Sequence, residues 1–171
     1  MALEKIRSPK KVIPAKKAAV YSAGIALAGL LVGVGIKFLD IYTEGLGNIF
    51  SQMSVWIFLC SVLAAYSSTP RRAAVNVLLF CASMLPAYYI TAEATGSSYS
   101  MIFVWGWAIF ALFSPALAFA TWYAKGKSVL SKWLTGGILG IMLIVAVVMF
   151  DKIRLSDLIF AGLTAIMLLK S

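Results

Sequence analysis

Long apolar segments separated by short polar stretches form the main pattern of this chain. A helix of about 20 residues crosses the hydrocarbon core of a bilayer, and most of the apolar segments approach or exceed that length. The sequence therefore predicts an all-α integral membrane protein, a compact bundle of six transmembrane helices that follows a basic tail over residues 1–17. The predicted spans are residues 18–39, 49–66, 73–92, 101–124, 130–150 and 155–169.

The composition favours a membrane protein over a soluble one. The 171 residues are 62% hydrophobic and only 12% charged, whereas a soluble domain carries about 25% charged residues. A net charge of +9 would suggest nucleic-acid binding in a soluble protein. No basic stretch here is interleaved with exposed aromatic residues, as nucleic-acid binding would require. We therefore expect the lipid bilayer, and not nucleic acid, as the partner of the basic residues.

Charged residues are distributed unequally between the two sides of the predicted bundle. All but three of the 15 Lys and Arg residues lie in the tail, around the second and fourth connections or at the C-terminal end; the exceptions are Lys37, Lys152 and Arg154. Among the acidic residues, only Glu4 lies on the basic side. Because Lys and Arg are enriched in cytoplasmic loops, we expect both termini in the cytoplasm.

Residues at the ends of the segments have predicted local roles. Lys37 can pair with Asp40, three residues later, but we expect its side chain to extend to the membrane interface. Asn48 is the expected N-cap of the second helix. Ser156 and Asp157 are expected to cap the last helix, where a negative charge favours the helix dipole.

Small residues recur at helical spacing along the first segment. Such a face lets another helix approach closely, which is how helices pack within a membrane. It either packs inside this bundle or docks against a different membrane protein. The candidate docking residues are Ala19, Ser22, Ala23, Ala26, Gly29 and Gly33.

Aromatic and polar side chains gather in the halves of the segments that are expected to face outward. Aromatic rings that converge with a few polar groups commonly line small-molecule sites. A flat heterocycle or an amine would suit this set, by stacking or cation–π contact with Glu93 as counter-charge. A belt of aromatic anchors at the membrane interface is the alternative. The candidate ligand-binding residues are Asn48, Gln52, Trp56, Tyr88, Tyr89, Glu93, Trp105 and Trp107.

Residues suited to catalysis or metal binding are sparse. The chain has no histidine, and its two cysteines, Cys60 and Cys81, fall inside apolar segments. We therefore expect no metal and no cofactor, and we expect the cysteines to be small buried residues. They can form a disulfide only if their helices touch. No serine is paired with a base and no buried carboxylate pair is visible, so we do not expect an enzyme.

The layout of the whole chain resembles the substrate-binding S components of energy-coupling-factor vitamin transporters. Those are six-span bacterial proteins of this size, whose ligand pocket opens outward. Their first helix docks through small-xxx-small residues against a transmembrane coupling subunit, and Ala19-xxx-Ala23 and Ser22-xxx-Ala26 match that motif here. The resemblance implies a substrate-binding subunit in a bacterial cytoplasmic membrane that takes a small solute from the extracellular side for ATP-driven uptake.

Other interpretations stay open from the sequence. The runs at residues 48–58 and 104–127 are also similar to an uncharacterised family of small six-span bacterial membrane proteins, which implies no function. A structural or regulatory subunit of another membrane complex, without a ligand of its own, is one alternative. A homo-oligomeric channel or small transporter is the other, although polar residues within the spans are too sparse to define a path in one copy.

Overall fold

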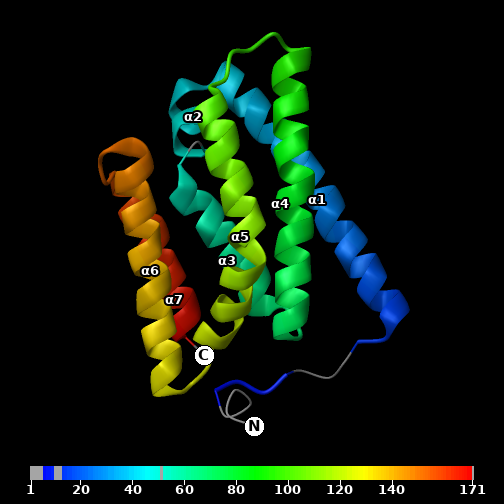
Figure 1. The fold of residues 1–171 in the computed structure, drawn as a ribbon, viewed down its shortest axis with the longest axis vertical. Coiled ribbons are helices and arrows are strands. Elements are labelled where there is room, and N and C mark those ends of the chain that lie inside the picture. The colour runs from blue at the N-terminus through cyan, green and yellow to red at the C-terminus, as the bar shows by residue number, and fades with distance from the viewer. Residues whose placement is uncertain (1–5, 10–12, 51, 171) are drawn as a thin grey trace.

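A computed structural model describes residues 6–9, 13–50 and 52–170, which form a bundle of helices (Figure 1). No strand occurs among these residues, so the all-α fold predicted from the sequence is confirmed. The helices are α1 (Ala15–Tyr42), α2 (Glu44–Phe50), α3 (Met53–Tyr66), α4 (Pro70–Ala94), α5 (Met101–Ala124), α6 (Val129–Phe150) and α7 (Leu155–Leu169).

Four of the described helices, α1, α4, α5 and α6, are long and apolar enough to cross a membrane. The apolar helices α3 and α7 are shorter, with 14 and 15 residues. At 1.5 Å per residue they extend for about 21–23 Å, against about 30 Å of hydrocarbon. Large apolar side chains cover the outside of the bundle, and Val20, Leu112 and Val148 are each more than 70% exposed. Such an exterior is compatible with a multi-pass membrane protein.

The helices alternate in direction along the bundle (Figure 1). α1, α4 and α6 run towards one end, and α3, α5 and α7 return to the other. Both Arg7 and Lys170 lie at the end where α3, α5 and α7 finish, since Arg7 bonds to the carbonyl of Trp122 and the carbonyl of Lys170 accepts from Lys125. We call this the closed end. The end where α1, α4 and α6 finish is called the open end.

The second predicted span is divided in the structure. α2 ends at Phe50 and α3 begins at Met53, with the backbone extended at Gln52. The indole Nε1 of Trp56 donates to the carbonyl of Phe50 at 2.8 Å and so holds the break in place. Asn48 lies inside α2 and does not cap α3 as expected. Because α3 starts late, it stops short of the open end.

The backbones of α1 and α4 approach very closely. A Cβ atom added at Gly29 would lie 2.6 Å from the carbonyl oxygen of Phe80, and one at Gly33 would lie 2.4 Å from that of Met84. Only glycine fits such a contact without movement of the backbone. Gly24 and Gly35, on the same helix, have open space around them. Gly29 and Gly33 therefore fix how near α1 lies to α4.

Two prolines interrupt the backbone hydrogen bonds of long helices, and a serine side chain compensates for one of them. Pro86 and Pro115 both lie within helices, in α4 and α5. Ser114 Oγ donates at 2.8 Å to the carbonyl of Ala111, which Pro115 leaves without its usual backbone donor. Such local side-chain bonds are how prolines are tolerated in membrane helices.

The two cysteines meet in the core. Cys60 on α3 and Cys81 on α4 are buried free thiols, as expected, and their sulfur atoms are 3.6 Å apart. The helices thus touch at the point where a disulfide would require them to touch.

Candidate functional site

A cavity of about 680 Å³ lies at the open end of the bundle. This volume is within the range of about 300–1,000 Å³ that small-molecule sites occupy. Ser98 and Ser100, in the connection from α4 to α5, border the cavity and are exposed, so the cavity reaches the molecular surface there. Its aromatic lining residues are Phe50, Trp56, Tyr88, Tyr89, Tyr99, Phe103, Trp107 and Phe150.

The cavity follows from the unequal lengths of the helices. α4 has 25 residues and α5 has 24, whereas α3 has only 14. The space above the start of α3 is covered only in part by the short α2, which lies at the open end (Figure 1). Because the long helices continue past the point where α3 begins, their inward side chains border a space instead of another helix.

Edge-to-face contacts between aromatic rings stiffen the wall of the cavity. The ring centroids of Trp56 and Trp107 are 5.6 Å apart at 83°, and those of Tyr88 and Tyr89 are 5.2 Å apart at 84°. Tyr89 also contacts Tyr99, at 5.1 Å. Aromatic pairs prefer this geometry, which adds to the stability gained by burial. The wall is thus largely formed before any solute enters.

Asp40 supplies the carboxylate of the cavity. Its Oδ2 atom accepts from Lys37 Nζ at 2.8 Å and from the Tyr88 hydroxyl at 2.9 Å. The expectation that Lys37 extends to the interface is wrong, because its side chain is only 2% exposed and points into the bundle. A buried ammonium group needs a partner of opposite charge, and Asp40 provides it three residues later on the same helix.

Arg154 supplies the second charged group, from the connection between α6 and α7. Its guanidinium carbon lies 5.1 Å from the ring centroid of Phe150, which also lines the cavity. Among the described residues, the Lys37–Asp40 contact is the one ion pair within 4.0 Å. Arg154 therefore borders the cavity without a direct carboxylate partner in the described part of the chain.

A buried polar network fixes the start of α7 and with it Arg154. The backbone N–H of Arg154 donates to Asp157 Oδ2 at 2.8 Å, and Ser54 Oγ on α3 donates to Asp157 Oδ1. Ser156 Oγ donates to the side-chain oxygen of Gln52, next to the break before α3. Asp157 thus caps the last helix, as the sequence suggested, and also joins it to α3. The expectation that Ser156 is a cap as well is wrong, because its hydroxyl bonds to Gln52 instead.

The structure brings some of the candidate ligand-binding residues together and separates others. Trp56, Tyr88, Tyr89 and Trp107 all line the cavity. Gln52 is buried, and it bonds to Ser156 at the start of α7.

Three further candidates have other positions. Glu93 is exposed near the end of α4 and accepts from the Tyr99 hydroxyl. Trp105 is 65% exposed on the outside of α5, whereas Trp107, two residues later, faces the cavity. The side chain of Asn48 lies outside the described part of the structure.

Asp40 and Arg154 are the charged residues of the cavity lining, and the sequence did not select them as ligand-binding candidates. In the sequence both are charges that set the orientation of the chain, and Asp40 is also a possible partner of Lys37. The available signal was that Lys37, Lys152 and Arg154 depart from the general distribution of basic residues. A basic residue on the side that otherwise carries acidic residues is unusual enough to mark a candidate site residue. Arg154 is such a residue, and it lines the cavity.

The small-residue face of α1 is divided between the interior and the surface. Gly29 and Gly33 pack against α4, and Ser22 Oγ donates to Asn76 Oδ1 on α4 at 3.1 Å. Ala26 is partly buried, whereas Ala19 and Ala23 are exposed. Ser22, Gly29 and Gly33 are thus occupied by contacts with α4 within the chain. Of the candidate docking residues, Ala19 and Ala23 are the ones exposed to a partner.

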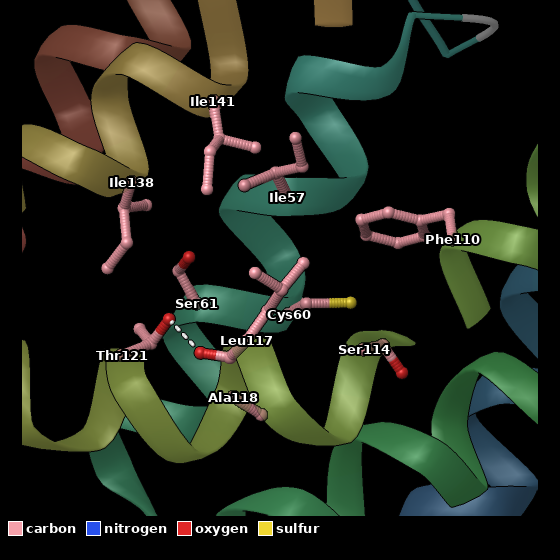
Figure 2. A pocket seen from close by; sticks show the side chains of 10 residues that line it. All are labelled: Ile57, Cys60, Ser61, Phe110, Ser114, Leu117, Ala118, Thr121, Ile138 and Ile141. Atoms are coloured by element: carbon pink, nitrogen blue, oxygen red, sulfur yellow. Dashed lines mark hydrogen bonds between the residues drawn. The ribbon is translucent and has the colours of Figure 1, made fainter. Parts of the chain in front are cut away.

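A second, much smaller cavity lies between α3, α5 and α6 (Figure 2). Its volume of about 30 Å³ is enough for one or two water molecules at most. Isoleucine side chains and Phe110 border it, and Thr121 Oγ1 donates to the carbonyl of Leu117 on its own helix at 2.7 Å. This cavity is too small for a solute.

Comparison of the chain with protein-family models, curated proteins and solved structures finds no match. Among the described residues, no group of three or more His, Cys, Asp or Glu side chains could hold a metal ion. The open-end cavity is therefore interpreted from its own geometry.

Proposed function

We propose that this membrane protein binds a small solute in the open-end cavity. The observation that carries the proposal is a space of about 680 Å³ that reaches the surface and is bordered by stiffened aromatic rings, Asp40 and Arg154. Apolar walls with a few fixed polar groups are typical of solute sites. The proposed role is binding, and we assign no catalytic step to these residues.

We further propose that the chain crosses a bacterial cytoplasmic membrane six times, with the open end outside. The alternating directions of α1, α3, α4, α5, α6 and α7 support this count. The short helices α3 and α7 would span by local thinning of the bilayer or through their flanking residues. Most described basic residues lie at the closed end, which favours its location in the cytoplasm.

A substrate-binding subunit of an ATP-driven uptake transporter is the form of this function that the S-component resemblance suggests. The outward cavity supports the binding part of that proposal. For the coupling partner, Ala19 and Ala23 offer an exposed small-residue surface on α1. Copurification from native membranes tests this part, and an Ala23→Leu variant should lose a partner that a Val20→Leu variant keeps.

Solute binding is tested by thermal unfolding of the purified protein against a panel of metabolites. A ligand present at 100 times its Kd stabilises the folded state by about 2.7 kcal/mol, so a true ligand raises the Tm measurably. Ser98→Trp places a large side chain at the mouth of the cavity and should abolish the shift. Lys152→Trp, at an exposed site outside the lining, should leave it unchanged. Equal shifts in both variants would place binding elsewhere.

Orientation is tested separately with a thiol reagent that does not cross membranes. A cysteine at Ser98 should react in intact cells, and one at Lys127 only after the cells are made permeable. Cys60 and Cys81 are buried and should contribute little background. Labelling in the opposite order would place the cavity on the cytoplasmic side.

A further inference from the structure

We propose that the solute of the open-end cavity is an organic monoanion with a flat, aromatic body. This inference rests on the proposed solute-binding function and names the chemical class of the ligand. It predicts that the acidic group of the solute bonds to Arg154 and that its ring lies against the aromatic wall.

The charges that border the cavity favour an anion. Lys37 and Asp40 neutralise each other through an ion pair of 2.8 Å, and Tyr88 donates a further hydrogen bond to the same carboxylate oxygen. Arg154 then remains as the charge of the site without an ion-pair partner among the described residues. A guanidinium group binds a carboxylate through two parallel hydrogen bonds. A cationic solute would have to compete with Lys37 for Asp40.

The position of Arg154 is suited to this task. Its backbone is held by the N–H bond to Asp157, which is itself only 3% exposed and bonded to Ser54. Its guanidinium lies over Phe150, a lining residue, which keeps the group beside the cavity. Binding a ligand therefore requires little further ordering of the backbone, and a preorganised group loses less free energy on binding.

The shape of the wall favours a planar body over a flexible chain. Trp56, Trp107, Tyr88 and Tyr89 are fixed by contacts with one another at ring-centroid distances of 5.2–5.6 Å. Fixed rings offer faces and edges on which another ring can stack, which adds to the gain from burial. An acyl chain gains burial but not this stacking.

The test uses three probes of matched shape and opposite or no charge. The intact protein in detergent is titrated with 2-naphthoate, 2-naphthamide and 2-naphthylmethylammonium, and binding is followed by calorimetry. 2-Naphthoate should bind at least about tenfold more tightly than the neutral amide, because a charge-assisted hydrogen bond is lost with the amide. Decanoate serves as the flexible anion and should bind more weakly than 2-naphthoate.

Variants in the α6–α7 connection assign the effect to one side chain. Arg154→Gln should lower the affinity for 2-naphthoate about tenfold and leave that for 2-naphthamide unchanged. Lys152→Gln removes the same charge two residues away, at an exposed position, and should change neither affinity. Arg154→Lys should restore part of the preference for the anion.

The outcomes distinguish a failure of this inference from a failure of the proposed solute binding. If the amide or the ammonium probe binds best, or if Arg154→Gln acts no differently from Lys152→Gln, the anion assignment is overturned while solute binding stands. Decanoate binding as tightly as 2-naphthoate overturns the planar body. If the cavity binds none of the probes and no metabolite of the panel shifts the Tm, the proposed function itself fails.

Discussion

The two ends of the bundle use the same kinds of side chain for opposite purposes. At the closed end Arg7 donates to the carbonyl of Trp122 at 2.7 Å and to that of Ala65 at 2.8 Å, and its guanidinium lies 4.2 Å from the Trp122 ring centroid. The indole of Trp122 donates to the carbonyl of Ser67 at 2.8 Å. At the open end, an arginine and two tryptophans border a space.

The difference follows from which helix carbonyls the polar side chains reach and from where α3 begins. The last carbonyls of a helix have no partner within the helix, and a cation near them is favourable. Three helices finish at each end, but at the closed end Arg7 and Lys125 bond to the last carbonyls of α3, α5 and α7. At the open end α3 begins late, so side chains there face a cavity. Stability should therefore depend most on the closed end, and response to solute on the open end.

The largest expected effect is at the closed end. Trp122 is fully buried, so Trp122→Ala should lower the free energy of unfolding by about 3–5 kcal/mol. Trp133→Ala removes the same ring from a position that is 75% exposed, and should change stability little when the protein is in detergent. Denaturant unfolding followed by circular dichroism measures both. Equal losses of stability in the two variants would mean that the burial of Trp122 does not stabilise the closed end.

The next effect belongs to the open end and tests whether its charges are structural as well. Asp40→Asn leaves the ammonium of Lys37 buried without its counter-charge, and breaking a buried ion pair costs about 3–5 kcal/mol. Because Asp40 is itself 31% exposed, we expect the lower limit, about 3 kcal/mol. Lys37→Met should cost less, since Asp40 keeps its bond from Tyr88.

Asp151→Asn is the matched control, because Asp151 is exposed and lies in the left-handed conformation that asparagine tolerates. It should leave the free energy of unfolding within about 0.5 kcal/mol of the original protein. If Asp40→Asn also falls within that range, Lys37 must find another partner, and the open end would owe none of its stability to this pair.

A smaller loss is expected where α1 supports the cavity wall. Gly33→Ala forces a Cβ to within 3.1 Å of the Tyr88 nitrogen and closer still to the Met84 carbonyl, so α1 must move away from α4. Overpacking of this kind costs about 1–3 kcal/mol. Gly35→Ala, which meets open space, should be neutral or slightly stabilising, because alanine favours a helix.

The same pair of variants separates packing within the chain from docking to a partner. If Gly33→Ala lowers the Tm of the isolated protein and weakens solute binding, the small residues at this level hold the wall of the cavity. A Gly33→Ala protein with unchanged stability, but unable to copurify with a partner, would contradict that assignment.

Much of the fold could be predicted from the lengths of the apolar segments alone, because each long helix must cover a continuous apolar surface with other helices or with lipid. The break after Phe50 could not be predicted. Polar residues such as Gln52 lie near the start of residues 49–66, but a polar first turn and a break look alike in a sequence, and it is the indole of Trp56, bonded to the Phe50 carbonyl, that holds the interruption. The hydrophobicity of a segment predicts a membrane helix more reliably than it predicts a break within that helix.

The site was only partly predictable, for two physical reasons. Successive residues turn by about 100° around a helix, so Trp105 and Trp107 cannot both face one cavity, and the sequence alone does not say which one does. Asp40 and Arg154 are more than 100 residues apart and meet the same space only through tertiary packing. Local clustering found the rings, whereas the charges came from elsewhere in the chain.

The smallest expected effect concerns the connection that borders the mouth of the cavity. The Tyr99 hydroxyl donates to the Glu93 carboxylate, and that bond raises the pKa of Tyr99 above its ordinary value of 10.0. A raised pKa in the folded state means that any stability from this bond is fully present below pH 10 and is lost as the pH rises through the folded pKa. The pair is exposed, so the effect on stability is small.

The pKa itself is the sharper measurement. Glu93→Gln removes the negative charge and should move the Tyr99 titration, followed by the ultraviolet absorbance of tyrosinate, back towards pH 10. In a Tyr99→Phe background the same substitution should move nothing, which assigns the change to this pair. If Glu93→Gln shifts the titration equally in both backgrounds, Glu93 acts on another tyrosine. The open end would then differ from the closed end in its cavity, but not in having a Tyr99–Glu93 hydrogen bond that depends on pH.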